Sequence, residues 1–212
     1  MLENKDTENL KPNEIRDIVV ESGMQLIPIV GSSLASLYFS TKQEKRFKRL
    51  EKFYKELSED VERIKDQIIF PSDTNEEDDF IALVEEINEA VERENIEEKK
   101  NYFKTYFISL LTQPIKLDFT KKYFFITTLK RMTILEIEIL IELYKENEPI
   151  VVENIKKENV EQYAIVGSIN RIKSYGFIMK TEQKWEALSN PLKEEILIND
   201  YGKSFCKFCL NN

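Results

Sequence analysis

Residues 133–146 read TILEIEILIELYKE, and they decide more about the fold than any other part of the chain. Thr133 followed three residues later by Glu136 matches the capping box, in which each side chain accepts a hydrogen bond from the backbone N–H of the other residue. Apolar residues fill most of the positions that follow, and Pro149 cannot continue a helix. The pattern therefore predicts a helix that begins at residue 134 and ends before Pro149.

Five further elements are expected after this helix, and the longest of them is a helix over residues 161–175. Its apolar residues, Ile165, Val166, Ile169, Ile172 and Tyr175, recur at helical spacing and should face the core. Gly176 allows the positive φ that turns this helix into a strand. A polar wing with Trp185, Asn190 and Pro191 then leads to the last strand. In chain order we expect a strand at 150–151, a helix over 153–159, a helix over 161–175, a strand over 177–180 and a strand over 196–198.

This order of elements resembles that of winged helix-turn-helix domains. The string Tyr175-Gly176-Phe177-Ile178 resembles the leucine-glycine-leucine-isoleucine landmark of bacterial members. The residues 199–203, which read NDYGK, resemble their leucine-threonine-x-x-glycine landmark, with Asn199 or Asp200 in place of the threonine. The resemblance covers residues 133–209, little over a third of the chain.

In that superfamily the third helix enters the major groove of DNA and the wing contacts phosphate. The resemblance therefore implies that the outward face of the third helix, with lysines of the wing beside it, contacts nucleic acid or a partner. The implied contact residues are Gln162, Gly167, Asn170, Arg171, Ser174, Lys180 and Lys184.

The net charge of this domain argues against DNA binding as its simple function. Residues 128–212 hold 12 lysines and arginines against 13 acidic residues, so −1 of the chain's net charge of −8 lies there and −7 lies before it. Phosphate neutralisation supplies much of DNA affinity, so a domain without a basic excess binds DNA weakly unless its charges segregate or it dimerises. Many winged helices dock proteins instead, and we expect protein contact ahead of DNA contact.

The region before this domain is expected to be a helical bundle. Apolar residues recur at helical spacing over 41–69 and again over 77–112, with a bend or a register shift expected in the polar interval 92–101. Asp118 can cap a short aromatic helix after that. Few glycines and prolines, five and six, with 33 % charged residues, also favour long helices.

The predicted fold is therefore mainly α, in two domains. Residues 1–12 are polar and aperiodic and predict a disordered tail. A helical bundle is expected over 13–130, and a winged helix with a small β-ribbon over 131–212.

The most apolar segment, 23–39, carries no charged residue and precedes the basic positions Lys42, Lys45, Arg46, Lys48 and Arg49. One interpretation is a hairpin that lies on or inserts into an anionic membrane. The other is a helix kinked at Pro28 and buried in the bundle, which we favour because Gln25 and the serines are costly against hydrocarbon. The basic positions are interpreted as a solvated helix face, since glutamates share the same helix.

No residue set identifies a reaction. Histidine is absent, which removes the commonest general base and the commonest nitrogen ligand of zinc. Cys206 and Cys209 form a C-x-x-C motif, but a zinc site needs four ligands, so we expect packed or half-exposed thiols, with an intermolecular disulfide or a metal shared in an oligomer as alternatives. The acids of 76–79 are expected to complement a helix dipole. No catalytic residue, cofactor or metal is predicted.

The expected function is that of a non-enzymatic interaction or regulatory protein whose winged helix docks a protein partner or a second copy of the chain. Its use of Ile, Lys and Asn indicates an AT-rich bacterial or phage genome. Two alternatives stay open, a DNA-binding transcriptional regulator and a membrane-active defence or toxin effector acting through 23–39. Few cysteines and no cleavable N-terminal signal predict a cytoplasmic location.

Overall fold

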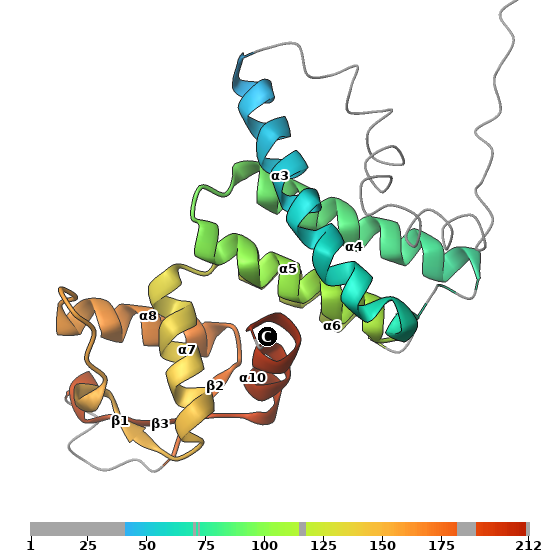
Figure 1. Cartoon of the computed structure of the whole chain (residues 1–212). Helices are drawn as coiled ribbons and strands as arrows, with labels where there is room; N and C mark the ends of the chain where they lie inside the picture. Colours follow the sequence, from blue (N-terminus) through green and yellow to red (C-terminus); the bar gives the residue numbers. More distant parts are fainter. Residues whose placement is uncertain (1–40, 70, 72, 115–117, 182–189, 211–212) are drawn as a thin grey trace, which may run out of the picture. The chain divides into compact units, whose positions relative to one another are not determined.

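A computed structural model describes residues 41–69, 71, 73–114, 118–181 and 190–210, the first four by backbone alone. These residues are mainly helical, with one small antiparallel sheet (Figure 1). They belong to two compact units, which divide after Lys122, inside the helix α6 (Phe119–Arg131). The predicted tail at 1–12 and the apolar segment 23–39 lie outside the described residues.

The first unit is built on three helices that pack against one another. They are α3 (Thr41–Ile64), α4 (Thr74–Arg93) and α5 (Glu97–Thr112), and a short 3-10 turn, η1 (Lys65–Gln67), follows α3. The periodicity predicted over 41–69 is confirmed, because α3 buries Leu50, Phe53, Tyr54, Leu57 and Val61. A buried hydrogen bond of 2.6 Å from the Tyr54 hydroxyl to Asn88 Oδ1 joins α3 to α4.

The bend predicted within 77–112 is a complete break between α4 and α5. The Glu94 carboxylate accepts hydrogen bonds from the backbone N–H groups of Asn95 and Ile96, at 2.8 and 3.0 Å. Such local bonds from side chain to backbone offer the chain an alternative to helical hydrogen bonds. At its other end α4 begins at Thr74, earlier than predicted, because the Asp73 side chain accepts a hydrogen bond from the N–H of Glu76 and caps the helix.

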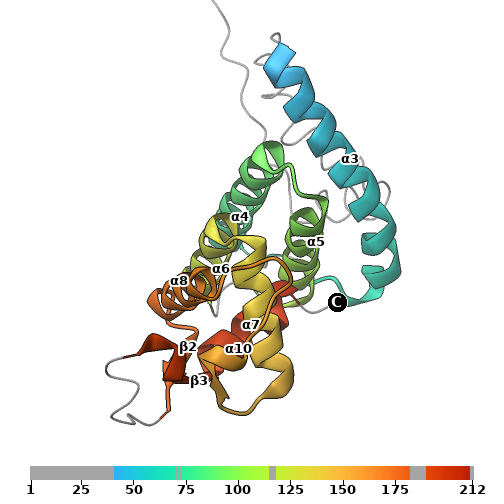
Figure 2. The ribbon, with the colours of Figure 1, turned by 90° about the vertical axis from the view of Figure 1, so that its left-hand side faces the viewer.

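The second unit combines the rest of α6 with short helices and the sheet. Its elements are α7 (Ile134–Glu146), β1 (Ile150–Val151), the 3-10 turn η2 (Val152–Asn154), α8 (Gln162–Ser174), β2 (Ile178–Lys180), the 3-10 turn η3 (Pro191–Lys193), β3 (Glu195–Ile198), α10 (Asp200–Phe205) and the π-helical turn η4 (Cys206–Leu210). The strand order is β1-β3-β2, all antiparallel, and β2 and β3 lie side by side in Figure 2. Helix α7 contacts α8, β3, α10 and η4 and forms the centre of the unit.

Most elements of this unit were predicted at nearly the observed bounds. The capping box is confirmed by both of its hydrogen bonds, from the N–H of Glu136 to Thr133 Oγ1 at 3.3 Å and from the N–H of Thr133 to Glu136 Oε2 at 3.0 Å. Gly176 has the expected positive φ, 76°. Strands β1, β2 and β3 and helix α8 lie where the sequence placed them.

The helix predicted over 153–159 is wrong. Only η2 forms there, and the backbone is already extended at Ile155. The side chain of Gln162 supplies the reason, since its Nε2 donates to the carbonyl oxygens of Val152 and Ile155, at 3.0 and 3.2 Å, in place of helical N–H groups. Asn159, in the left-handed region with a φ of 58°, turns the chain into α8.

A close backbone approach joins α10 to the start of the ribbon. The N–H of Asn199 donates to the carbonyl oxygen of Phe177 at 3.0 Å, and the Asn199 side chain accepts a hydrogen bond from Gly202 and caps α10. The rings of Phe177 and Phe205 stack with centroids 4.4 Å apart. This is why the second sequence landmark carries a glycine: a side chain at 202 would collide with the Phe177 carbonyl.

Among the described helices, none is both long enough and apolar enough to cross a membrane.

Candidate functional site

The outward face of α8 is the surface that the sequence marked for contact. Ile165, Ile169 and Ile172 are at most 1 % exposed, so they hold one side of the helix against the core. The opposite side presents Tyr163, which is 68 % exposed, and the exposed residues Gly167, Asn170 and Ser174. Their spacing of four, three and four places them on one stripe, which we call the α8 face.

Arg171 lies beside this stripe and forms an ion pair with Glu136 of α7. Its Nε lies 3.0 Å from Oε1 of Glu136, a carboxylate whose residue is 1 % exposed. Its Nη2 donates to the carbonyl oxygen of Arg131 at 3.0 Å and to the hydroxyl of Tyr175 at 3.1 Å. The hydrogen bond with Tyr175 and the charge of Glu136 raise the pKa of Arg171. Glu136 thus serves two purposes, the capping box of α7 and the orientation of Arg171.

Lys180 also forms an ion pair with a buried carboxylate, that of Glu194. Its Nζ lies 3.0 Å from Oε1 of Glu194, while Nζ of Lys173 lies 2.5 Å from Oε2 of the same carboxylate. Glu194 is only 6 % exposed. Burial alone would raise the pKa of Glu194, but the hydrogen bonds from the two lysines outweigh it and lower the pKa. This cluster joins α8 and β2 to the residue between η3 and β3.

The seven residues implied for contact therefore separate into different roles, and Gly167 is exposed on the α8 face. Asn170 and Ser174 are exposed on the α8 face, although the Ser174 hydroxyl also donates to the carbonyl of Arg171 at 2.6 Å. Gln162 supports the turn before α8, and its Oε1 accepts a hydrogen bond from Lys156 at 2.8 Å. Arg171 and Lys180 are ion-paired. Lys184 lies outside the described residues.

Sequence reasoning missed Tyr163, the largest exposed side chain of α8. The signal was present, because Tyr163 stands seven residues, or two helical turns, before Asn170 and so shares its face. Met179, on the neighbouring strand β2, is also 48 % exposed and was not predicted as a contact residue. Both side chains add apolar area without adding charge.

The two cysteines are packing residues. Cys206 and Cys209 are buried free thiols in η4. Burial raises the pKa of Cys206 to about 12 and raises that of Cys209 as well, so neither is a reactive thiolate near neutral pH. Within the described ranges, no three acidic or cysteine side chains are grouped so as to hold a metal ion.

Comparisons of the chain with protein-family models, with curated proteins and with solved structures found no match. What the α8 face can do follows from its own chemistry. It offers an exposed aromatic ring and neutral hydrogen-bonding groups, and both cations of α8, Arg171 and Lys173, are ion-paired. Such a face suits contact with protein better than contact with a phosphate backbone.

Proposed function

We propose that residues 133–210 form a winged helix-turn-helix whose α8 face docks a protein, in a non-enzymatic interaction or regulatory protein of a bacterium or phage. The order of helices and strands supports this fold, as does a three-stranded sheet in which the first strand, β1, pairs with the last, β3. The second helix of the motif is reduced to η2, which is a departure from the usual pattern. Burial of Ile165, Ile169 and Ile172 supports α8 as the helix that presents its opposite face to a partner.

The observation that carries the docking role is the pairing of both described cations of the predicted contact set. Arg171 is held by Glu136 and Lys180 by Glu194, and both carboxylates are buried. A DNA phosphate that recruited either cation would leave a buried carboxylate with fewer partners. The side chains of Arg171 and Lys180 are themselves 50 % and 54 % exposed, so drawing either cation away costs less than the roughly 3–5 kcal/mol of a fully buried pair, but it still opposes a phosphate contact. A protein partner needs neither cation to leave its carboxylate.

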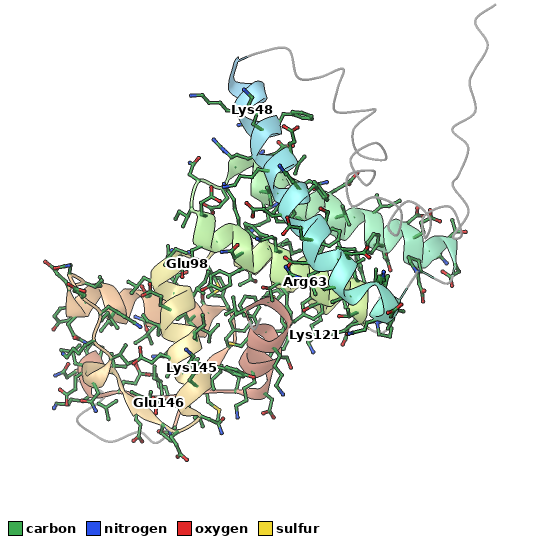
Figure 3. All side chains as sticks on the ribbon, viewed as in Figure 1. Lys48, Arg63, Glu98, Lys121, Lys145 and Glu146 are labelled. Atoms are coloured by element: carbon green, nitrogen blue, oxygen red, sulfur yellow. The ribbon has the colours of Figure 1, made fainter. Side chains whose placement is uncertain are left out.

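Site-specific photo-crosslinking tests this proposal. A photoreactive amino acid is placed at Asn170, on the α8 face, and, as a control, at Lys145, which is exposed near the end of α7 (Figure 3). We expect irradiation in cells to give a protein adduct at position 170 that is absent at position 145. An adduct with a second copy of this chain would identify self-association, which light scattering of the purified protein then checks. Absence of any protein adduct at position 170, or equal adducts at both positions, would contradict docking through α8.

DNA binding is measured separately, by fluorescence anisotropy with fragments of AT-rich genomic DNA. At roughly physiological salt, ~0.15 M, we expect no shift for the purified protein. Tight binding with a steep salt dependence, lost when Asn170 is changed to Asp, would instead support the transcriptional regulator. Because Asn170 is exposed and has no role in the core, this change separates DNA contact from loss of folding.

A further inference from the structure

A basic pocket of about 280 Å³ lies in the first unit, where the first half of α3 meets the end of α4. It shares no residue with the α8 face. Four cations and one amide line it, namely Lys45, Arg46, Arg49, Arg93 and Asn95. No carboxylate is among these lining residues. We propose that this pocket binds the doubly charged phosphate group of a small phosphorylated molecule or of a phosphomonoester lipid headgroup.

The cations of the pocket differ in the hydrogen bonds and ion pairs that they already form. Lys45 and Arg46 are exposed and have no ion-pair partner among the described residues. Arg49 donates from Nη1 to the carbonyl oxygen of Glu92 at 2.5 Å, which orients the guanidinium and leaves most of its donors for a ligand. Arg93 lies 2.9 Å from Glu89, but both side chains are well exposed, so this pair is weak and a ligand can recruit the arginine.

Structural contacts account for Arg49 and, weakly, for Arg93, but not for Lys45 or Arg46. Arg49 satisfies a carbonyl near the end of α4, where helix carbonyls lack partners. Nothing comparable holds Lys45 or Arg46 beside it. Gathering like charges costs free energy through their repulsion, and this chain has a net charge of −8, so a general basic character does not account for the cluster. A bound anion would convert that repulsion into attraction.

The residue types indicate phosphate. Each arginine presents a planar fork of N–H donors that matches two phosphate oxygens, and lysine adds a compact charge. The pocket volume of about 280 Å³ is ample for a phosphate group, and because the pocket is open to solvent the rest of a ligand can extend out of it. Arg93 is the last residue of α4 and Asn95 lies in the break that follows, so neither is near α3 in the sequence, which explains why the sequence alone indicated only a solvated face on α3.

Titration calorimetry of the full chain with pyrophosphate is the direct test. We expect binding that weakens with salt, and weakens about tenfold or more in Arg46→Gln, because a charge-assisted hydrogen bond to phosphate is lost. Arg63→Gln is the matched control. Arg63 lies toward the other end of the same helix from Lys48 (Figure 3). In the part of the chain that the structure describes its one ion-pair partner is Asp60, with Nη1 2.8 Å from Oδ1, so its replacement should leave binding unchanged.

Flotation with phosphatidylcholine vesicles, with and without phosphatidic acid, distinguishes the two sources of the phosphate. Flotation only with phosphatidic acid, reduced by Arg46→Gln and unaffected by Arg63→Gln, assigns a lipid headgroup. Pyrophosphate binding without flotation assigns a soluble ligand. If neither probe binds, or if both arginine variants lose binding equally, the pocket is not a phosphate site. Single-stranded RNA binding that pyrophosphate does not compete with would also overturn the proposal.

Discussion

The approach of Gly202 to Phe177 allows a sharp test of the packing of the second unit. A Cβ added at residue 202 would lie 2.2 Å from the Phe177 carbonyl oxygen and 2.9 Å from Cγ1 of Ile198. The first of these atoms belongs to the backbone and cannot swing away as a side chain could. The same carbonyl accepts the hydrogen bond from Asn199, so any shift of Phe177 disturbs a second contact.

The expected cost of Gly202→Ala follows from these contacts. Overpacking costs about 1–3 kcal/mol, and a weakened hydrogen bond adds about 0.5–1.5 kcal/mol. Alanine recovers about 1 kcal/mol of helix propensity, because Gly202 lies within α10. With a contact as short as 2.2 Å, we expect a net loss of about 2–3 kcal/mol in the free energy of unfolding. For a unit of this size that lowers Tm by roughly 10–20 °C.

Gly167→Ala is the matched control in the same unit. Gly167 lies within α8 with no atom within 4 Å of the added Cβ and with no positive φ. The same substitution should therefore raise stability by about 0.5–1 kcal/mol, through helix propensity alone. Urea unfolding followed by circular dichroism measures both variants, and hydrogen exchange across 177–205 localises the effect to this unit. Equal stability of Gly202→Ala and the wild type would refute the close approach, as would destabilisation by Gly167→Ala of the same size.

Three further results are expected. Ile169→Ala should cost about 2–5 kcal/mol in urea unfolding, because Ile169 is 1 % exposed and its truncation leaves a cavity; a loss below about 1 kcal/mol would place α8 in a different register. Because the pKa of Glu194 is lowered in the folded protein, its contribution to stability is present above pH 4.5 and is lost as the pH falls from there through the lowered pKa. Glu194→Gln should therefore flatten the acid side of the curve of stability against pH. An unchanged curve would contradict the pairing of Glu194 with its two lysines. Cys206 and Cys209 should resist alkylation at pH 8 in the folded protein and react on unfolding, as mass spectrometry would detect; rapid modification of the native chain would show that the thiols are accessible.

Local sequence signals predicted the elements that depend on residues within a few positions of one another. The capping box of Thr133 and Glu136, the apolar stripe of α8 and the positive φ at Gly176 all belong to this class. Each works through neighbouring backbone groups or one helix face, so chain order is sufficient to recognise it. For the same reason the bounds of α7 and β1 were close to those observed.

The prediction of local structure failed where a side chain supplied a hydrogen-bond partner to the backbone. A helix was predicted over 153–159, but the Gln162 side chain donates to two carbonyl oxygens, of Val152 and Ile155, and favours η2 and an extended turn. Likewise, the polar interval after α4 suggested a bend, and the Glu94 carboxylate made it a break. Such side-chain contacts outweigh helix propensity, which spans at most about 0.7 kcal/mol per ordinary residue.

The sequence by itself determined a mainly helical chain, the positions of most helices and strands, and the helix face that α8 leaves exposed. Only the tertiary structure decided which charged side chains are available for contact. Arg171 finds Glu136 and Lys180 finds Glu194 across the fold, and Arg93 joins Arg46 from another helix. The physical reason is that an ion pair or a pocket depends on distances of a few ångströms between residues far apart in the chain, and no local pattern encodes those distances.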